Sequence, residues 1–95
     1  MRVYISGKIT GNKEYKKDFL EVEKNLLSIG YDVVNPTRLE EHYNGLSYDD
    51  FMDIDMVLLR GYDAIYMIKG WKSSCGANRE YGYALASGMK IMRED

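Results

Sequence analysis

The sequence contains few of the residues on which disulfide-bonded, zinc-binding and membrane proteins depend. Its 95 residues include one cysteine, one histidine and one proline, and no apolar run is long enough to span a membrane. A single cysteine excludes an internal disulfide, and Cys75 with His42 alone cannot form a zinc cluster. We therefore expect no metal ion and no cofactor. The chain enters an apolar segment directly after Arg2, without a targeting run, so we expect a cytoplasmic protein that does not bind membranes.

An excess of one charge is also lacking. The chain has 13 Lys and Arg against 15 Asp and Glu, which gives a net charge of −2, and the two signs are interspersed. The chain has no basic stripe of the kind that binds nucleic acid, so we do not expect a nucleic acid polymer as partner. The length predicts a single domain over residues 1–95, near the lower limit for a self-sufficient core, so we expect a homo-oligomer, a dimer or larger. Nine tyrosines against two phenylalanines favour partly wetted rings at a pocket or interface.

Short apolar segments alternate with helical patterns along the whole chain. Strands are predicted at 3–5, 31–34, 63–67 and 89–92, and helices at 13–29, 48–59 and 77–87. Asn12 is the expected N-cap of the first helix and Gly30 its end, while Ser47 and Asp50 form a capping box before the second. Residues 37–46 are polar and predict a loop over the site. Right-handed crossovers between these strands predict a parallel sheet with helices on both faces.

Glu80 is the first candidate for chemistry. The buried face of its helix is marked by residues at helical spacing, namely Ala77, Tyr81, Ala84 and Leu85, and Glu80 lies at the margin of that face. Such a carboxylate points toward the top of the sheet, where α/β folds keep their active sites. The simpler interpretation is that Glu80 only complements the positive end of the helix dipole.

Asp55 is the second candidate, because it lies on the predicted core-facing stripe between Phe51 and Leu58. An unpaired carboxylate on that stripe is costly and needs a partner, a raised pKa or an open cleft. Asp55 either caps nearby backbone amides or forms a pair with Glu80. Two carboxylates, one as nucleophile and one handling protons, are the groups that cleave glycosidic bonds.

Two loops could bind an anion or a sugar hydroxyl. The loop from Ser6 to Gly11 has two glycines and leads into a helix, and Ser73 and Ser74 precede the helix that carries Glu80. The alternatives are a plain strand-to-helix turn and simple helix caps.

Three segments together resemble the nucleoside 2-deoxyribosyltransferase superfamily. They are residues 3–11, Asp55 followed after eight residues by the strand at 63–65, and residues 76–84. The sequence is most similar to a small branch of uncharacterised, often phage-encoded members, and it also looks like the 2′-deoxynucleoside 5′-monophosphate N-hydrolases. The resemblance covers nearly the whole chain. Elements that complete the site in longer members are expected to be absent or to come from a neighbouring subunit.

The resemblance implies a role for each matching residue. Glu80 is the nucleophile that takes the deoxyribosyl group, Asp55 contacts the base and transfers protons, and Tyr4 orients Glu80. The residues that would bind the sugar and phosphate are Ser6, Gly7, Lys8, Ile9, Ser74 and Gly76.

One position separates the two enzyme branches. The transferases usually carry an aspartate six residues before the nucleophile, whereas the hydrolases carry a phosphate-binding serine, as Ser74 is here. The hydrolases also have a phosphate-binding arginine where this chain has Thr10, and Lys8 could supply that charge instead.

Pattern and resemblance together predict a flavodoxin-like three-layer α/β sandwich with a four-stranded parallel sheet of order 2-1-3-4. The expected function is hydrolysis or base exchange at the N-glycosidic bond of a small-molecule deoxynucleoside or deoxynucleotide. The alternatives are a catalytically silent nucleotide-binding or sensing module and a structural homo-oligomer. Both carboxylates favour the enzyme, since a sensor needs only the loops.

Overall fold

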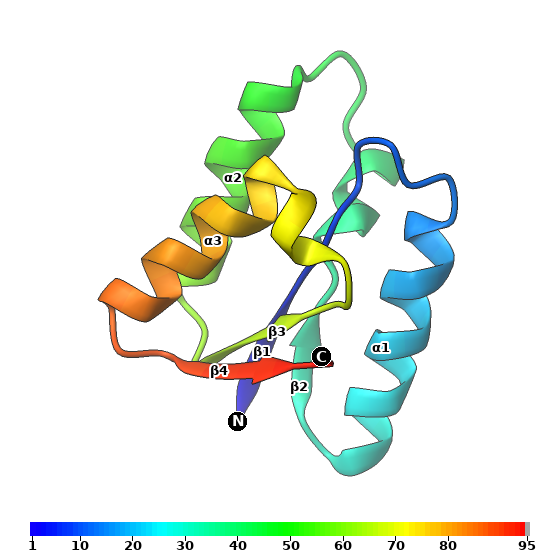
Figure 1. The fold of residues 1–95 in the computed structure, drawn as a ribbon. Coiled ribbons are helices and arrows are strands. Elements are labelled where there is room, and N and C mark those ends of the chain that lie inside the picture. The colour runs from blue at the N-terminus through cyan, green and yellow to red at the C-terminus, as the bar shows by residue number, and fades with distance from the viewer. Residues whose placement is uncertain (95) are drawn as a thin grey trace.

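A computed structural model describes residues 1–94 and confirms the α/β fold and the strand order (Figure 1). All strand pairs are parallel, in the order β2-β1-β3-β4, and Val3 of β1 lies between Val33 of β2 and Ala64 of β3. The strands are β1 (Arg2–Ser6), β2 (Asp32–Val34), β3 (Ala64–Met67) and β4 (Lys90–Arg93). The helices are α1 (Tyr15–Ile29), α2 (Tyr48–Arg60) and α3 (Cys75–Ala86), with 3₁₀ turns η1 (Pro36–Glu41) and η2 (Trp71–Ser73).

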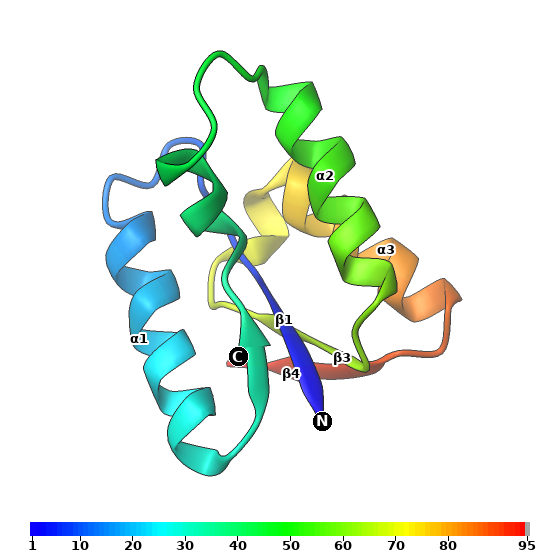
Figure 2. The same cartoon turned by 180° about the vertical axis from the view of Figure 1, so that it is seen from behind.

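The sheet has helices on both faces, α1 on one and α2 with α3 on the other (Figures 1 and 2). Alternation along β1 divides the core accordingly, because successive strand residues face opposite sides of a sheet. Val3 and Ile5 pack with Phe19 of α1, whereas Tyr4 packs with Ile65 in the second layer. Tyr4 therefore reaches the layer in which the two candidate carboxylates lie.

The predicted helix ends are right in two places and wrong in one. Gly30 ends α1 in the left-handed region with φ 105°, and Ser47 with Asp50 forms the capping box of α2. Asn12 is not the N-cap, since α1 begins three residues later. Its side chain instead accepts from the Glu14 amide and donates to the Lys8 carbonyl, which holds the loop after β1 in shape.

The buried faces of α2 and α3 are turned relative to the prediction. In α2, Asp55 is buried as predicted, but Met52 and Leu59 share its buried face, whereas Phe51 and Leu58 are only half-buried. In α3, Leu85 is 59% exposed although it was expected to face the core. Its neighbour Ala84 is the residue that meets the sheet, and successive helical residues point about 100° apart.

The segment predicted as a loop at 37–46 contains all of η1 except its first residue, Pro36. Asn35 Oδ1 accepts bonds from the amide and the hydroxyl of Thr37, which starts the turn. Tyr15 of α1 donates to Glu40 at 2.6 Å and ties η1 to α1. Within residues 1–94, no helix is long and apolar enough to cross a membrane.

Candidate active site

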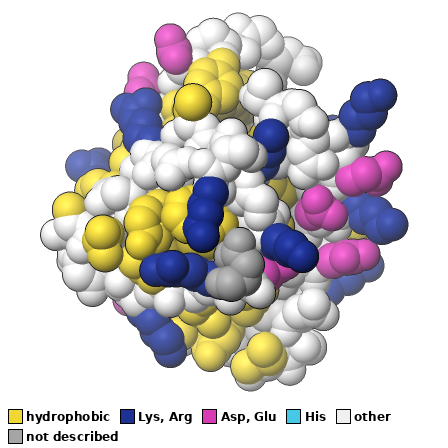
Figure 3. All heavy atoms as spheres, in the orientation of Figure 1, with side chains coloured by type: hydrophobic (Ala, Val, Ile, Leu, Met, Phe, Trp, Pro, Cys, Tyr) yellow, Lys and Arg dark blue, Asp and Glu magenta, His cyan; other side chains and the backbone are white. Residues whose placement is uncertain are grey.

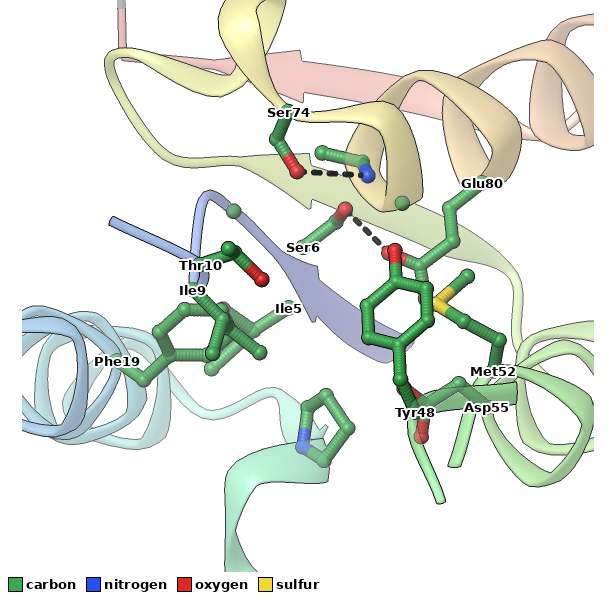
Figure 4. Close-up of a pocket in the computed structure, with 14 residues that line it drawn as sticks. Ile5, Ser6, Ile9, Thr10, Phe19, Tyr48, Met52, Asp55, Ser74 and Glu80 are labelled. Atoms are coloured by element: carbon green, nitrogen blue, oxygen red, sulfur yellow. Dashed lines mark hydrogen bonds between the residues drawn. The ribbon is translucent and has the colours of Figure 1, made fainter. Parts of the chain in front are cut away.

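A cleft lies at the carboxyl end of β1, with α1 and η1 on one side of it and α2 and α3 on the other (Figure 4). It contains about 370 Å³ of empty space, counting its open mouth. Ligands of open α/β sheets bind at this end of the strands. The lining combines the end of β1 and its loop with residues of α1, η1, α2 and α3, namely Ile5, Ser6, Gly7, Ile9, Thr10, Phe19, Pro36, Tyr48, Met52, Asp55, Ser74, Gly76, Ala77 and Glu80.

Glu80 is held in the cleft by two hydroxyl groups of β1. Its Oε2 accepts a hydrogen bond from the Tyr4 hydroxyl. Its Oε1 accepts one from Ser6 Oγ at 2.6 Å, which Figure 4 shows as a dashed line. The side chain is buried, with 5% exposed, rather than at the margin of the helix face as the sequence predicts. Burial raises the pKa of Glu80, and the bonds from Ser6 and Tyr4 oppose that rise because they favour the charged carboxylate.

Tyr4 remains a hydrogen-bond donor over the physiological range. Its ring is fully buried, and burial first, then the charges of Glu80 and Asp55, raise the pKa of Tyr4 well above its ordinary value of 10. A phenol that keeps its proton can only donate to the carboxylate it faces. Tyr4 therefore fixes the orientation of Glu80.

Asp55 lines the same cleft from α2 and is 9% exposed. Among residues 1–94, its buried Oδ1 has no hydrogen-bond partner. Burial first, then the charges of Glu80 and Glu40, raise the pKa of Asp55 to about 7. This carboxyl group can therefore either donate or accept a proton near neutral pH, and it has a free oxygen with which to do so.

The loop after β1 and the first turn of α3 meet at the cleft, and each has a glycine that lies close to other residues there. A Cβ at Gly7 would lie 3.1 Å from Ile68 Cβ, and one at Gly76 would lie 3.0 Å from the Tyr48 hydroxyl. Ile9 also lines the cleft. A side chain at Gly7 would press against the buried Ile68 and Phe19, whereas one at Gly76 would have to displace the ends of the Tyr48 and Met52 side chains.

Ser6, Ser74 and Lys8 are expected to bind the sugar and phosphate, and in the structure each also contacts another part of the chain. Ser6 contacts Glu80, so it orients the carboxylate from the floor of the cleft. Ser74 lines the cleft and is also the N-cap of α3, since its Oγ accepts the Ala77 amide at 3.2 Å. Its hydroxyl proton stays available for a ligand. Lys8 lies outside the lining, and its Nζ donates to Ser73 Oγ at 3.1 Å in an adjoining hollow.

Sequence reasoning missed the wall of the cleft, above all Tyr48. Its ring is 56% exposed and lies across the cleft with its hydroxyl toward α3 (Figure 4). Phe19 and Met52 also line the cleft, but in the sequence these apolar residues cannot be distinguished from ordinary core residues of a helix. Pro36, which also lines the cleft, begins η1. Its position directly after a predicted strand is the feature of the sequence that could have placed it at this end of the sheet.

Comparisons with known proteins agree with this fold. The family described as "Domain of unknown function (DUF4406)" matches residues 1–93. No curated protein matches the chain. Among solved structures, a 2-deoxyribosyltransferase from the psychrotolerant bacterium Bacillus psychrosaccharolyticus is similar with a TM-score of 0.79 and 18% sequence identity, over 98% of this chain and 71% of that one. The resemblance to a nucleoside 2-deoxyribosyltransferase-like fold is thereby confirmed.

Proposed function

The chain belongs to the DUF4406 family, and on that premise we propose that it cleaves the N-glycosidic bond of a 2′-deoxynucleoside or its 5′-monophosphate. The observation that carries the proposal is the buried Glu80 carboxylate, held by Tyr4 and Ser6 in a cleft that Asp55 also lines. The similar solved structure is a 2-deoxyribosyltransferase, which supports sugar transfer from a nucleoside as the class of reaction.

In the first step, Glu80 attacks C1′ of the deoxyribose. The bond between C1′ and the base nitrogen breaks as the bond from the Glu80 oxygen to C1′ forms. Asp55 in its protonated form gives its proton to the departing base, which a carboxyl group with a pKa of about 7 does in neutral solution. Tyr4 and Ser6 keep the carboxylate aligned for attack.

In the second step, Asp55 as a carboxylate accepts a proton from the acceptor. Water gives the free sugar, and a second base gives a new nucleoside. In either case the oxygen of water or a nitrogen of the base bonds to C1′ as the bond between Glu80 and C1′ breaks, and the carboxylate returns to its starting form. One acid and one nucleophile therefore complete a cycle without any other group.

The loops would hold the rest of the substrate. Gly7 and Ile9, which line the cleft, would contact the sugar, and Gly76 leaves room for the Tyr48 hydroxyl. Ser74 lies at the start of α3, where the first amides have no intrahelical acceptor and the helix dipole favours an anion. A 5′-phosphate at Ser74 favours the hydrolase branch over the transferase branch.

Release of free base is the direct test. Deoxynucleosides and deoxynucleoside 5′-monophosphates of all common bases are incubated with the protein, alone and with a second base, and the products are separated by chromatography. Base release with the wild type and none with Glu80→Gln is the expected result. Binding without release by the wild type would identify a silent nucleotide-binding module, and absence of both would leave the structural homo-oligomer.

A further inference from the structure

A second hollow opens beside the cleft. Both are bounded by Thr10, Tyr48 and Ser74, so the two spaces meet along this shared edge. The second hollow contains about 830 Å³ of empty space, counting its open mouth, more than twice the 370 Å³ of the first. Beyond the shared edge it is lined by Lys8, Ser73 and Cys75.

The position of the hollow follows from the proposed function, on which this inference rests. With the base beside Asp55 and C1′ at Glu80, the 5′ end of the sugar points toward Ser74, because Ser74 and Asp55 lie on opposite sides of Glu80 (Figure 4). A group attached beyond the first phosphate then crosses the shared edge. Thr10, which lines both spaces, forms part of that edge.

The charge of the hollow suits an anion. None of its six lining residues is acidic, and Lys8 is the one cation among them. The nearest acidic residues in sequence to Tyr48 are Asp49 and Asp50, and Asp50 is occupied by the Ser47 amide in the capping box. The lining therefore offers attraction to a phosphate without a facing carboxylate.

Lys8 is already placed across the hollow. Its Nζ donates to Ser73 Oγ, and that hydroxyl donates in turn to the Gly70 carbonyl at 3.1 Å. An ammonium group has three donors, so two remain for a ligand. This contact links the loop after β1 to the loop after β3 and holds the charge at the edge of the space.

We propose that this hollow binds the second phosphate of a 2′-deoxynucleoside 5′-diphosphate, with Lys8 as its ligand. The substrate class of the site then includes deoxynucleotides that carry more than one phosphate. The hollow is open to solvent at its outer end, so a third phosphate is tolerated without a contact of its own.

Two measurements separate this inference from the proposed function. Deoxyadenosine and deoxythymidine 5′-mono- and diphosphates are titrated calorimetrically into Glu80→Gln, which prevents turnover. The diphosphates should bind about tenfold more tightly, the effect of one charge-assisted hydrogen bond. Base release by the wild type is measured with the same four compounds, and its kcat/KM should follow the same preference.

Lys8→Met in the same background should abolish the difference between mono- and diphosphate. Lys72→Met is the matched control, since Lys72 is exposed one residue before Ser73 and does not line the hollow. Equal or weaker binding of the diphosphates, or an equal effect of the two lysine variants, would overturn the subsite. Tighter diphosphate binding without base release from any compound would keep the subsite and reject the enzyme.

Discussion

Asp55 and Glu80 occupy equivalent positions in two helices that pack on the same face of the sheet. Each is the middle residue of a buried stripe with spacing i, i+3, i+7, which is Met52, Asp55 and Leu59 in α2, and Ala77, Glu80 and Ala84 in α3. Positions at this spacing share one helix face. A carboxyl group therefore stands where a hydrophobic residue would stabilise the fold. Burial raises the pKa of both groups, and the charge of Glu80 raises that of Asp55 further.

Glu80→Gln should reduce base release at least about 1000-fold, because the amide is not a nucleophile. The variant should fold, since the amide has the size of the carboxyl group and can still bond to Ser6 and Tyr4. Because a buried group with a raised pKa opposes folding when charged, the melting temperature should be unchanged or higher at pH 8. Undiminished base release, measured by chromatography, would show that Glu80 is not the nucleophile.

Asp55→Asn should slow base release and stabilise the protein at neutral pH. The pKa of Asp55 is about 7 in the folded chain against an ordinary 3.8, so the folded state holds the proton more tightly and stability falls as pH rises from about 4 to about 7. About three pKa units correspond to at most about 4 kcal/mol, and the partial exposure of the site makes about 1–3 kcal/mol the expected gain at pH 8.

The measurement for Asp55 is urea unfolding of wild type and variant at pH 4 and pH 8. The difference in unfolding free energy should be small at pH 4 and large at pH 8. A carboxyl resonance that titrates near 7 in the wild type by NMR is the independent check. A normal aspartate titration together with a destabilised variant would instead identify Asp55 as a structural cap.

Tyr4→Phe should lower kcat by about 10- to 100-fold, since it removes one of the two hydroxyl groups that orient Glu80. The same bond lowers the pKa of Glu80, so its loss should move the acid limb of the pH–rate profile to higher pH. Tyr62→Phe is the control, because that ring packs edge-to-face on Tyr4 with centres 6.5 Å apart in the same core layer. An unshifted acid limb in Tyr4→Phe would restrict Tyr4 to packing.

The sequence pattern and the family resemblance together predicted the sheet order, and the predicted pair of Asp55 and Glu80 lines one cleft. The sequence did not predict how α2 and α3 are rotated about their axes, which decides which residues face the sheet. Leu85 and Ala84 are adjacent, and only packing against the sheet decides which of them is buried. The same rotation buries Glu80 rather than leaving it at the margin. The direction of Lys8 could not be predicted either, since its partner Ser73 lies 65 residues away.

A 5′-phosphate should improve binding through Ser74 at the start of α3. The gain should be about 1.5–3 kcal/mol for each charge-assisted hydrogen bond, before desolvation. The comparison is calorimetric titration of a deoxynucleoside and its monophosphate into Glu80→Gln, with and without Ser74→Ala. Because Ser74 also caps α3, its melting temperature is followed as well. Equal affinities of the two ligands would favour the transferase branch.

Self-association is expected on the outer face of α2. Asp53, Val57 and Arg60 follow one another at helical spacing, and Val57 is 60% exposed within an apolar hollow that includes Ile54 and Leu58. Two copies of α2 packed antiparallel about Val57 would bring Asp53 of one near Arg60 of the other. On the side of the molecule where α1 lies, Figure 3 shows Lys and Arg interspersed with Asp and Glu, so no patch of a single charge directs a partner to that side.

Sedimentation equilibrium at micromolar concentration should therefore give a dimer or larger. Val57→Glu places two like charges at the centre of this contact and should shift the protein to monomer. Leu27→Glu is the matched control, because Leu27 is a similarly exposed apolar residue, 51% exposed, on α1. A wild-type monomer with undiminished activity at nanomolar concentration would contradict the oligomer. Dissociation by Leu27→Glu but not by Val57→Glu would instead place the contact on α1, because a buried unpaired charge disrupts only the surface that is covered.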